Sequence, residues 1–424
     1  MRRFVQASLI LFMMTAMTRP ALADAPELSA WLLNTTGLTG YGGAAANVQQ
    51  IRYSASAVYV NATGVPSYTI GPWPGNPNTA SNQNWVFQIP RNPAPAAVKT
   101  ATGLGAIGVW SNGVAMFNAK DAFSYNNQNT WFQNAVYVEA GSFDSCLGHP
   151  QMTGAYHHHQ NPRCVYKADS RRHSPLIGYA IDGYPIYGAY AYASSDGSGG
   201  IVRIRSSYRF RIITNRSNPS PAGPAIDATH PLGYYVQDFE YVVGLGDLDA
   251  YNGRFAVTPE YPAGTYAYYA TIDELGASAY PYAVGPSYNG TPVTPNGHVT
   301  VPGGVTTYVP SSPGRVLTTL TADRFSSTQI TIAWNVSCTS AGASDYGIFE
   351  GQLGVWYTHT ALTCTDTSHD FTETVTTTAG DRYYLVVPLG SGKEGSYGTA
   401  TGGNEIPLGG PAFCFALQAP AVCP

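Results

Sequence analysis

The sequence has little charge of either sign and no long apolar run after its first 23 residues. Charged residues make up 11% of the 424 residues, and the formal net charge is −4. An average soluble domain has roughly 25% charged residues. A weakly acidic chain of this kind lacks the basic surface that binding to nucleic acid requires. Because no segment after residue 23 approaches the length of a membrane span, we expect no span in the mature chain.

Several catalytic motifs are also missing. The sequence contains no G-x-S-x-G motif, which positions the nucleophilic serine of many hydrolases. It has no glycine-rich phosphate loop followed by the required lysine. None of the six cysteines is arranged as C-x-x-C, the spacing typical of thiolate metal sites. These absences argue against serine hydrolases, P-loop nucleotidases and cysteine-based zinc sites.

The residues that are abundant favour strands and turns. The chain contains 46 Gly, 31 Pro and 31 Tyr, a mixture that disfavours long helices and, through its aromatic content, disorder. Three segments read as β-hairpins, at residues 106–117, 176–190 and 254–272. Their turns contain Asn112-Gly113, Asp182-Gly183 and a Pro/Gly sequence, and Asn and Gly accept the positive φ of tight turns. We predict an all-β fold.

The first residues resemble a signal peptide. Arg2 and Arg3 precede the mostly apolar stretch 4–17, and the small-residue pattern 21–23 suits a signal peptidase. We expect residues 1–23 to be removed and the protein to be secreted or periplasmic. The alternative is that the same segment serves as an N-terminal membrane anchor.

Composition divides the remaining chain into two domains. Residues 24–290 form one unit rich in Tyr, Gly and Asn, and we expect a large sandwich-like β-domain there. Residues 291–314 are rich in Pro, Gly, Ser and Thr, which indicates a linker or edge segment. Residues 315–424 are rich in Thr, and the segment 330–334 alternates apolar and polar side chains with the period of a strand. We predict a smaller C-terminal β-sandwich there.

The cysteines fit an oxidising compartment. They fall into a central pair and a C-terminal group of four. Proximity along the chain favours three disulfides among the possible pairings. These are Cys146–Cys164, Cys338–Cys364 and Cys414–Cys423.

The sharpest feature is a histidine cluster. Four of the nine histidines, His149 and His157 to His159, fall within eleven positions. On a strand, His157 and His159 point to the same face, about 6.6–7 Å apart, where their imidazoles can converge on one ion. A Cys146–Cys164 disulfide would hold His149 near them. His158 would point to the opposite face of the strand, either to the surface or to a position behind the metal ligands.

We therefore predict a metal site formed by His157 and His159 together with His149 or His173. A three-histidine site with an open position suits Zn²⁺ or copper. A metal site that performs chemistry needs an acid or base nearby, and the candidates are Glu260 and Asp144. Glu260 ends a predicted strand, and Asp144 lies next to Cys146. The alternative is a hydrogen-bonded, Tyr- and His-rich strand without metal.

The motifs resemble those of the YHYH domain family of exported bacterial proteins, over roughly residues 30–290. In chain order, the matching segments are Gly154 to His159 with Asn161 to Cys164, His173 to Tyr179, Asp182 to Gly188, Leu248-Asp249, Asn252 to Arg254, Thr258 to Glu260 and Gly264 to Tyr266. The namesake motif has Tyr where this chain has His158, whereas its two histidines are kept as His157 and His159. The resemblance implies export and a metal site, without a particular reaction.

Residues 315–424 are similar to the fibronectin type III-like modules of secreted bacterial proteins, which implies spacing or attachment. Two functions follow from the sequence. The first is an exported metal-binding protein, which as an enzyme would act on an extracellular polymer such as a polysaccharide. The second is a non-catalytic cell-surface, glycan-binding or adhesion protein whose histidines are structural and whose tyrosines bind sugar. The sequence does not decide between them.

Overall fold

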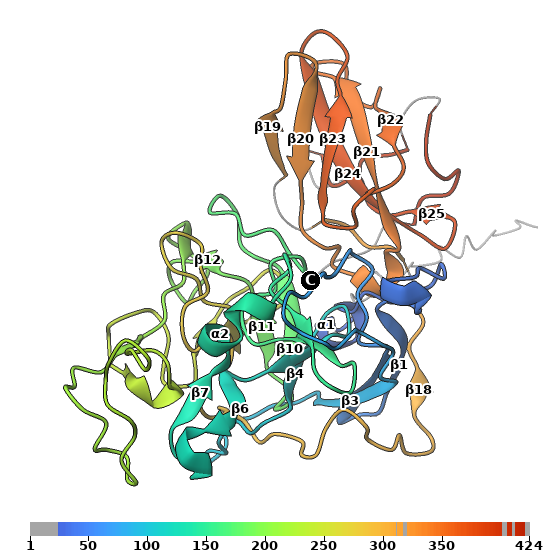
Figure 1. Cartoon of the computed structure of the whole chain (residues 1–424). Coiled ribbons are helices and arrows are strands. Elements are labelled where there is room, and N and C mark those ends of the chain that lie inside the picture. The colour runs from blue at the N-terminus through green and yellow to red at the C-terminus, as the bar shows by residue number, and fades with distance from the viewer. Residues whose placement is uncertain (1–23, 311, 317–319, 401–404, 409–411, 420–424) are drawn as a thin grey trace, which may run out of the picture.

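The computed structural model describes residues 24–310, 312–316, 320–400, 405–408 and 412–419 (Figure 1). The predicted signal peptide lies outside these residues. The described chain is built almost entirely of strands, and its two α-helices, α1 (Pro26–Ser29) and α2 (Ala135–Val138), have four residues each. The prediction of an all-β fold is confirmed.

The large domain is organised around an eight-stranded sheet of order β16-β17-β11-β10-β4-β5-β9-β8. These strands are β4 (Ala106–Trp110), β5 (Ala115–Phe117), β8 (His149–Pro150), β9 (Tyr156–His158), β10 (Leu176–Ala180), β11 (Pro185–Tyr187), β16 (Gly253–Ala256) and β17 (Thr265–Tyr269). The pairs β5–β9 and β11–β17 are parallel, and the other neighbours are antiparallel. The hairpins β4–β5, β10–β11 and β16–β17 confirm the three predicted from turn residues.

Both faces of this sheet are buried. One face packs against a four-stranded sheet of order β18-β1-β2-β3. Its strands are β1 (Val48–Tyr53), β2 (Ala57–Ala62), β3 (Trp85–Pro90) and β18 (Thr306–Thr307). Val60 and Phe87 of the small sheet share a core with Val109 and Tyr269 of the large one. The other face covers a second core that includes Trp110. The large domain is therefore sandwich-like, as predicted.

Short ribbons and turns complete the large domain. The two-stranded sheets are β6 (Lys120–Ser124) with β7 (Phe132–Asn134), β12 (Tyr190–Tyr192) with β13 (Ile201–Arg203), and β14 (Tyr208–Phe210) with β15 (Phe239–Tyr241). The 3₁₀ turns are η1 (Tyr41–Gly43), η2 (Tyr125–Asn127), η3 (Ala140–Ser142) and η4 (Val236–Asp238). Strand β18 lies within the predicted linker 291–314 and pairs with β1, so this segment contributes an edge strand to the large domain.

The C-terminal residues form a second lobe, seen above the large domain in Figure 1. It contains a three-stranded sheet, β19-β20-β23, and a four-stranded sheet, β22-β21-β24-β25. Their bounds are β19 (Thr321–Arg324), β20 (Gln329–Ala333), β21 (Asp345–Gln352), β22 (Thr360–Thr363), β23 (Thr372–Thr376), β24 (Arg382–Gly390) and β25 (Lys393–Glu394), with the 3₁₀ turn η5 (Ser340–Gly342). Ile332, Ile348 and Val375 share one core between the sheets. This arrangement is a β-sandwich.

The disulfides correct part of the predicted connectivity. Cys146 is bonded to Cys164, as predicted. Cys364 is bonded to Cys414, so the predicted pairs Cys338–Cys364 and Cys414–Cys423 are both wrong. The reason is the sheet: the segment before Cys414 lies beside β22, where the N–H of Ala361 donates to the carbonyl of Ala412 (3.0 Å). In the described part of the chain, no helix has the length and apolar character to cross a bilayer.

Candidate metal centre

The candidate site lies at the β8–β9 end of the eight-stranded sheet. His149 of β8 and His157 of β9 are direct cross-strand partners. Because side chains alternate along a strand, His157 and His159 share a face, and His158 points to the other. The ring of His157 stacks on Phe117 with centroids 4.0 Å apart. The register of β9 therefore brings the predicted histidines together.

His158 occupies the opposite core. Its ring packs edge-on against Tyr156 (5.2 Å between centroids) and Trp110 (6.3 Å). Its exposed fraction is 0%. Of the two positions expected for His158, the surface is therefore wrong, because both faces of this sheet are covered; a role behind the site stays a prediction.

The three imidazoles converge through their Nε2 atoms. The Nε2 atom of His157 lies 3.2 Å from that of His149 and 3.0 Å from that of His159. All three ligand atoms lie within 4.8 Å of one another, and all three residues are buried. Two nitrogens bound to a tetrahedral ion at about 2.0–2.1 Å lie about 3.3–3.4 Å apart, and a 90° angle gives about 2.9 Å. The observed separations lie between these values.

The Nδ1 atom of each of the three rings forms a hydrogen bond on the side of the ring opposite the Nε2 atom. Nδ1 of His157 lies 2.9 Å from the carbonyl oxygen of Ala155, and Nδ1 of His159 lies 2.6 Å from that of Asn118. A carbonyl can only accept a hydrogen bond, so we assign the proton of both rings to Nδ1. Their Nε2 atoms then carry lone pairs.

The same assignment follows for His149 through Ser142. The Ser142 hydroxyl donates to the carbonyl oxygen of Glu139 (2.8 Å), which uses its only hydrogen. Its oxygen is therefore the acceptor for Nδ1–H of His149 at 2.7 Å. All three Nε2 lone pairs consequently point into one small volume, where they repel one another unless a cation lies between them. Fixing the tautomer in this way is how proteins prepare imidazoles as metal ligands.

The electrostatic surroundings keep these rings neutral. Burial, followed by the neighbouring His159, lowers the pKa of His149 to about 3. Burial lowers the pKa of His159 to about 4 and that of His157 well below its usual value. Neutral imidazole is the form that coordinates a metal, so protons do not compete for the nitrogens near neutral pH.

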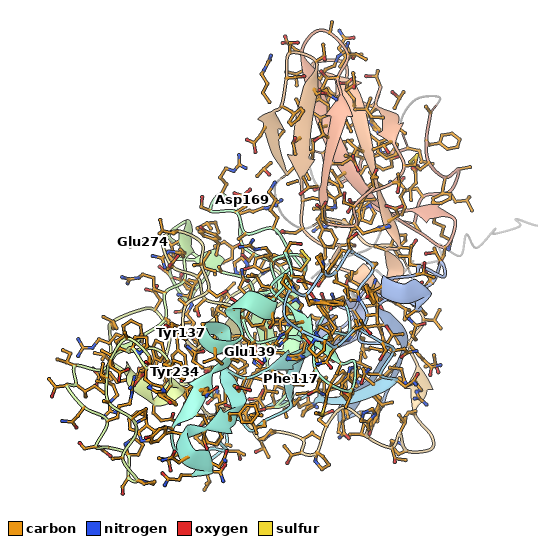
Figure 2. All side chains as sticks on the ribbon, in the orientation of Figure 1. Phe117, Tyr137, Glu139, Asp169, Tyr234 and Glu274 are labelled. Atoms are coloured by element: carbon orange, nitrogen blue, oxygen red, sulfur yellow. A yellow bond between two sulfur atoms is a disulfide. The ribbon has the colours of Figure 1, made fainter. Side chains whose placement is uncertain are left out.

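Glu139 is a component of the site that the sequence analysis missed. It follows α2 (Figure 2). Its Oε2 atom lies 3.4 Å from Nε2 of His159 and 3.7 Å from Nε2 of His149. Burial, followed by the charge of Asp121, raises the pKa of Glu139 to about 7. The sequence held one usable signal, since Glu139 is the glutamate nearest to the histidine cluster along the chain.

A surface cleft of about 450 Å³ borders the site. It is lined by Pro74, Gly75, Val138, Glu139, Gly141 and Ser142. Glu139 and Ser142 both contact the imidazoles directly. The cleft therefore lies beside the histidine cluster, separated from it by Glu139 and Ser142.

The fourth predicted ligand, His173, lies apart from this cluster. Its Nδ1 is 2.6 Å from the carbonyl oxygen of Ser174, and its ring packs against Tyr187 and Tyr192. Tyr187 belongs to β11, four strand spacings or about 19 Å from β9. His173 is buried in a different part of the domain.

The two predicted acid–base residues also lie elsewhere. The Asp144 carboxylate accepts hydrogen bonds from Trp73 Nε1 (3.0 Å), the Tyr156 hydroxyl (3.2 Å) and the backbone N–H groups of Gly71, Cys146 and Gly148. Tyr156 points away from His157, so Asp144 shapes the loop from the opposite face of β9.

Glu260 accepts a hydrogen bond from the Tyr187 hydroxyl (2.8 Å) at the far end of the sheet. Burial raises the pKa of Glu260 to about 7, which sequence alone could not reveal. Its partner Tyr187 stands on β11, so neither predicted carboxylate shares the volume into which the Nε2 atoms point.

Comparison with known proteins agrees with the resemblance noted in the sequence. No curated protein matches the chain. The family model described as YHYH protein matches residues 86–279, which include the three converging histidines and Glu139. Residues 86–279 of the chain are therefore similar to the YHYH domain.

Proposed function

We propose that this protein is an exported metal-binding protein whose His149–His157–His159 site holds Zn²⁺ or copper. The observation that supports this most strongly is the convergence of three Nε2 atoms, with those of His149 and His159 at 3.2 Å and 3.0 Å from that of His157 and every Nδ1 atom in a hydrogen bond behind its ring. Such a cluster is unfavourable without a cation and favourable with one. A purely hydrogen-bonded cluster would instead alternate donors and acceptors.

The donor set supports Zn²⁺ and copper among the common ions. Imidazole nitrogen suits both, whereas Ca²⁺ and Mg²⁺ prefer oxygen ligands. Three histidines leave coordination positions for other donors, among them water or substrate, as in catalytic zinc sites. The cleft beside Glu139 gives that position a route to solvent. This supports a metal-dependent enzyme acting on an extracellular substrate as the catalytic form of the proposal.

Export is part of the same proposal. The sequence at residues 1–23 has the three regions of a signal peptide. The disulfides Cys146–Cys164 and Cys364–Cys414 are of the kind that persists in oxidising compartments. The C-terminal sandwich, with sheets of three and four strands, supports a fibronectin type III-like module for spacing or attachment.

A second candidate function is glycan binding without catalysis. It is favoured by a cleft of about 580 Å³ whose lining includes Tyr137, Tyr208, Phe210, Phe239 and Tyr280. Phe210 and Tyr137 are exposed, at 50% and 49%. Aromatic faces of this kind stack on sugar rings. This function predicts saccharide binding that a chelator leaves unchanged.

Elemental analysis of the purified protein tests the first proposal. We expect one zinc or copper ion per chain, and loss of that ion in the His157→Ala and His159→Ala variants. His298→Ala is the matched control, because His298 is exposed and packs on Trp85 outside the site. Circular dichroism of each variant verifies folding. Folded wild-type protein without metal, which also binds none when Zn²⁺ or Cu²⁺ is added, contradicts the proposal.

A further inference from the structure

Glu139 places a carboxylate oxygen beside the imidazoles of His149 and His159. We propose that its carboxylate is a fourth ligand beside the three imidazoles, and that the site therefore selects a divalent ion, Zn²⁺ or Cu²⁺, over Cu⁺. This inference rests on the proposed metal-binding function and extends it from the class of site to the oxidation state of the ion.

The position of the Glu139 carboxylate fits a shared ion and no direct hydrogen bond. Its Oε2 atom is buried and has no hydrogen-bond partner. The distances of 3.4 Å and 3.7 Å to the Nε2 atoms of His159 and His149 are too long for hydrogen bonds. Two donors bound to one tetrahedral ion lie about 3.4 Å apart. A buried oxygen without a partner, beside lone pairs that also lack one, is explained by a cation among them.

The backbone holds Glu139 in this position. Its N–H, directly after α2, donates to the carbonyl of Ala135, the first residue of that helix (2.9 Å), and its own carbonyl accepts a hydrogen bond from the Ser142 hydroxyl. The oxygen of that hydroxyl in turn accepts Nδ1–H of His149. One serine therefore links the backbone of the carboxylate ligand to the ring of an imidazole ligand. This arrangement fixes the two donors relative to each other before an ion arrives.

An anionic oxygen changes the preference of the site. Cu⁺ favours soft ligands and low coordination, and three neutral imidazoles alone tolerate it. A carboxylate is a hard donor, and its negative charge attracts a dipositive ion about twice as strongly as a monopositive ion at the same distance. With Glu139 in place, four donors of mixed nitrogen and oxygen character surround the ion, which favours Zn²⁺ and Cu²⁺.

The cleft identifies the route of the ion. The Glu139 side chain is 28% exposed although its Oε2 atom is buried. Its remaining atoms therefore face the cleft formed with Pro74, Gly75 and Gly141. An ion that enters through this cleft meets the carboxylate before it reaches the imidazoles.

The test compares Glu139→Gln with wild-type protein by competition against chromophoric chelators for Zn²⁺, Cu²⁺ and Cu⁺. We expect the substitution to weaken Zn²⁺ and Cu²⁺ binding about 10–100-fold and to leave Cu⁺ binding within about 3-fold. Glu240→Gln is the control, because Glu240 pairs with Arg209 on the surface. X-ray absorption of the zinc-loaded protein is expected to give one oxygen neighbour of the ion that the glutamine variant alters.

The outcomes separate this inference from the proposed function. If wild-type protein binds none of the three ions, the proposed function fails. If it binds them and Glu139→Gln weakens all three equally, or none, the metal site stands and the role of Glu139 is overturned. The melting temperature of metal-free Glu139→Gln serves as a second readout. Because glutamine fits the same space, we expect this temperature to equal or exceed that of metal-free wild-type protein.

Discussion

Two regions of the eight-stranded sheet each bury a group of polar side chains, but only in one of them do hydrogen-bond acceptors face one another. At the β11–β17 end, Glu260 accepts hydrogen bonds from the Tyr187 hydroxyl and from the backbone N–H of Leu176. At the β8–β9 end, three Nε2 atoms and one carboxylate oxygen face one another, all as acceptors. Both groups have strongly shifted pKa values. The comparison teaches that burial and shifted pKa values alone do not indicate a ligand site. Several hydrogen-bond acceptors that face one another without a donor between them do indicate one.

The largest expected difference between the two ends is in stabilisation by metal. Saturating Zn²⁺ at about 1,000 times its Kd is expected to add about 4 kcal/mol to the free energy of unfolding of wild-type protein. His159→Ala loses this increment because one of the three imidazole ligands is gone. Glu260→Gln keeps it in full. Thermal unfolding with and without Zn²⁺ measures the increment, and equal increments in the two variants would refute the assignment of the site.

Removing a disulfide has the next largest effect. Cys146→Ser/Cys164→Ser opens a loop of 18-residue separation and is expected to cost about 3 kcal/mol in stability. It also weakens metal binding, because the bridge encloses the loop that contains His149, His157 and His159. The matched change, Cys364→Ser/Cys414→Ser, destabilises the C-terminal sandwich and leaves metal affinity unchanged. Denaturant unfolding and zinc titration separate the two effects, and a loss of affinity in both double variants would contradict this account.

A smaller effect is expected from Ser142→Ala. This change removes the oxygen that accepts Nδ1–H of His149 and so leaves the tautomer of that ring unfixed. Loss of such a supporting contact typically reduces metal affinity about 10-fold. Thr258→Ala is the control, since its hydroxyl lies 2.8 Å from that of Tyr187 at the other end of the sheet. Competition titration with a zinc chelator gives both affinities, and an unchanged affinity in Ser142→Ala would show that the serine does not fix the ring.

The smallest effect concerns pH and Glu260. Burial raises the pKa of Glu260 to about 7 from its ordinary 4.5. The folded state therefore binds the proton more tightly than the unfolded state, so stability falls as pH rises from about 4.5 through 7. Because Glu260 is partly exposed, we expect a fall of about 1 kcal/mol rather than the full value of the shift. Glu260→Gln removes this fall, which urea unfolding at pH 5 and pH 8 measures, and an identical pH dependence in both proteins would contradict the burial of the carboxylate.

Much of the fold and part of the site follow from local sequence. Asn112-Gly113 and Asp182-Gly183 mark hairpin turns because their backbone conformations are local properties. The i, i+2 spacing of His157 and His159 fixes a common face as soon as the segment is a strand. The Cys146–Cys164 bridge then closes the loop that contains His149.

The rest of the site depends on packing between distant segments. Glu139 reaches the imidazoles because α2 and η3 place it beside β8, and no periodicity in the sequence encodes that contact. His173 lies close to the cluster in sequence and far from it in the sheet, because β9 and β11 are separated by three strands. Cys364 bonds Cys414 for the same kind of reason, since strand neighbours need not be neighbours along the chain.

The most direct measurement is anomalous diffraction from crystals of the protein grown with Zn²⁺ and recorded at the zinc edge. The account predicts one strong peak per chain at about 2.0–2.1 Å from the Nε2 atoms of His149, His157 and His159. A zinc-soaked crystal with no peak among these nitrogens, while the rings keep the positions described above, would contradict it.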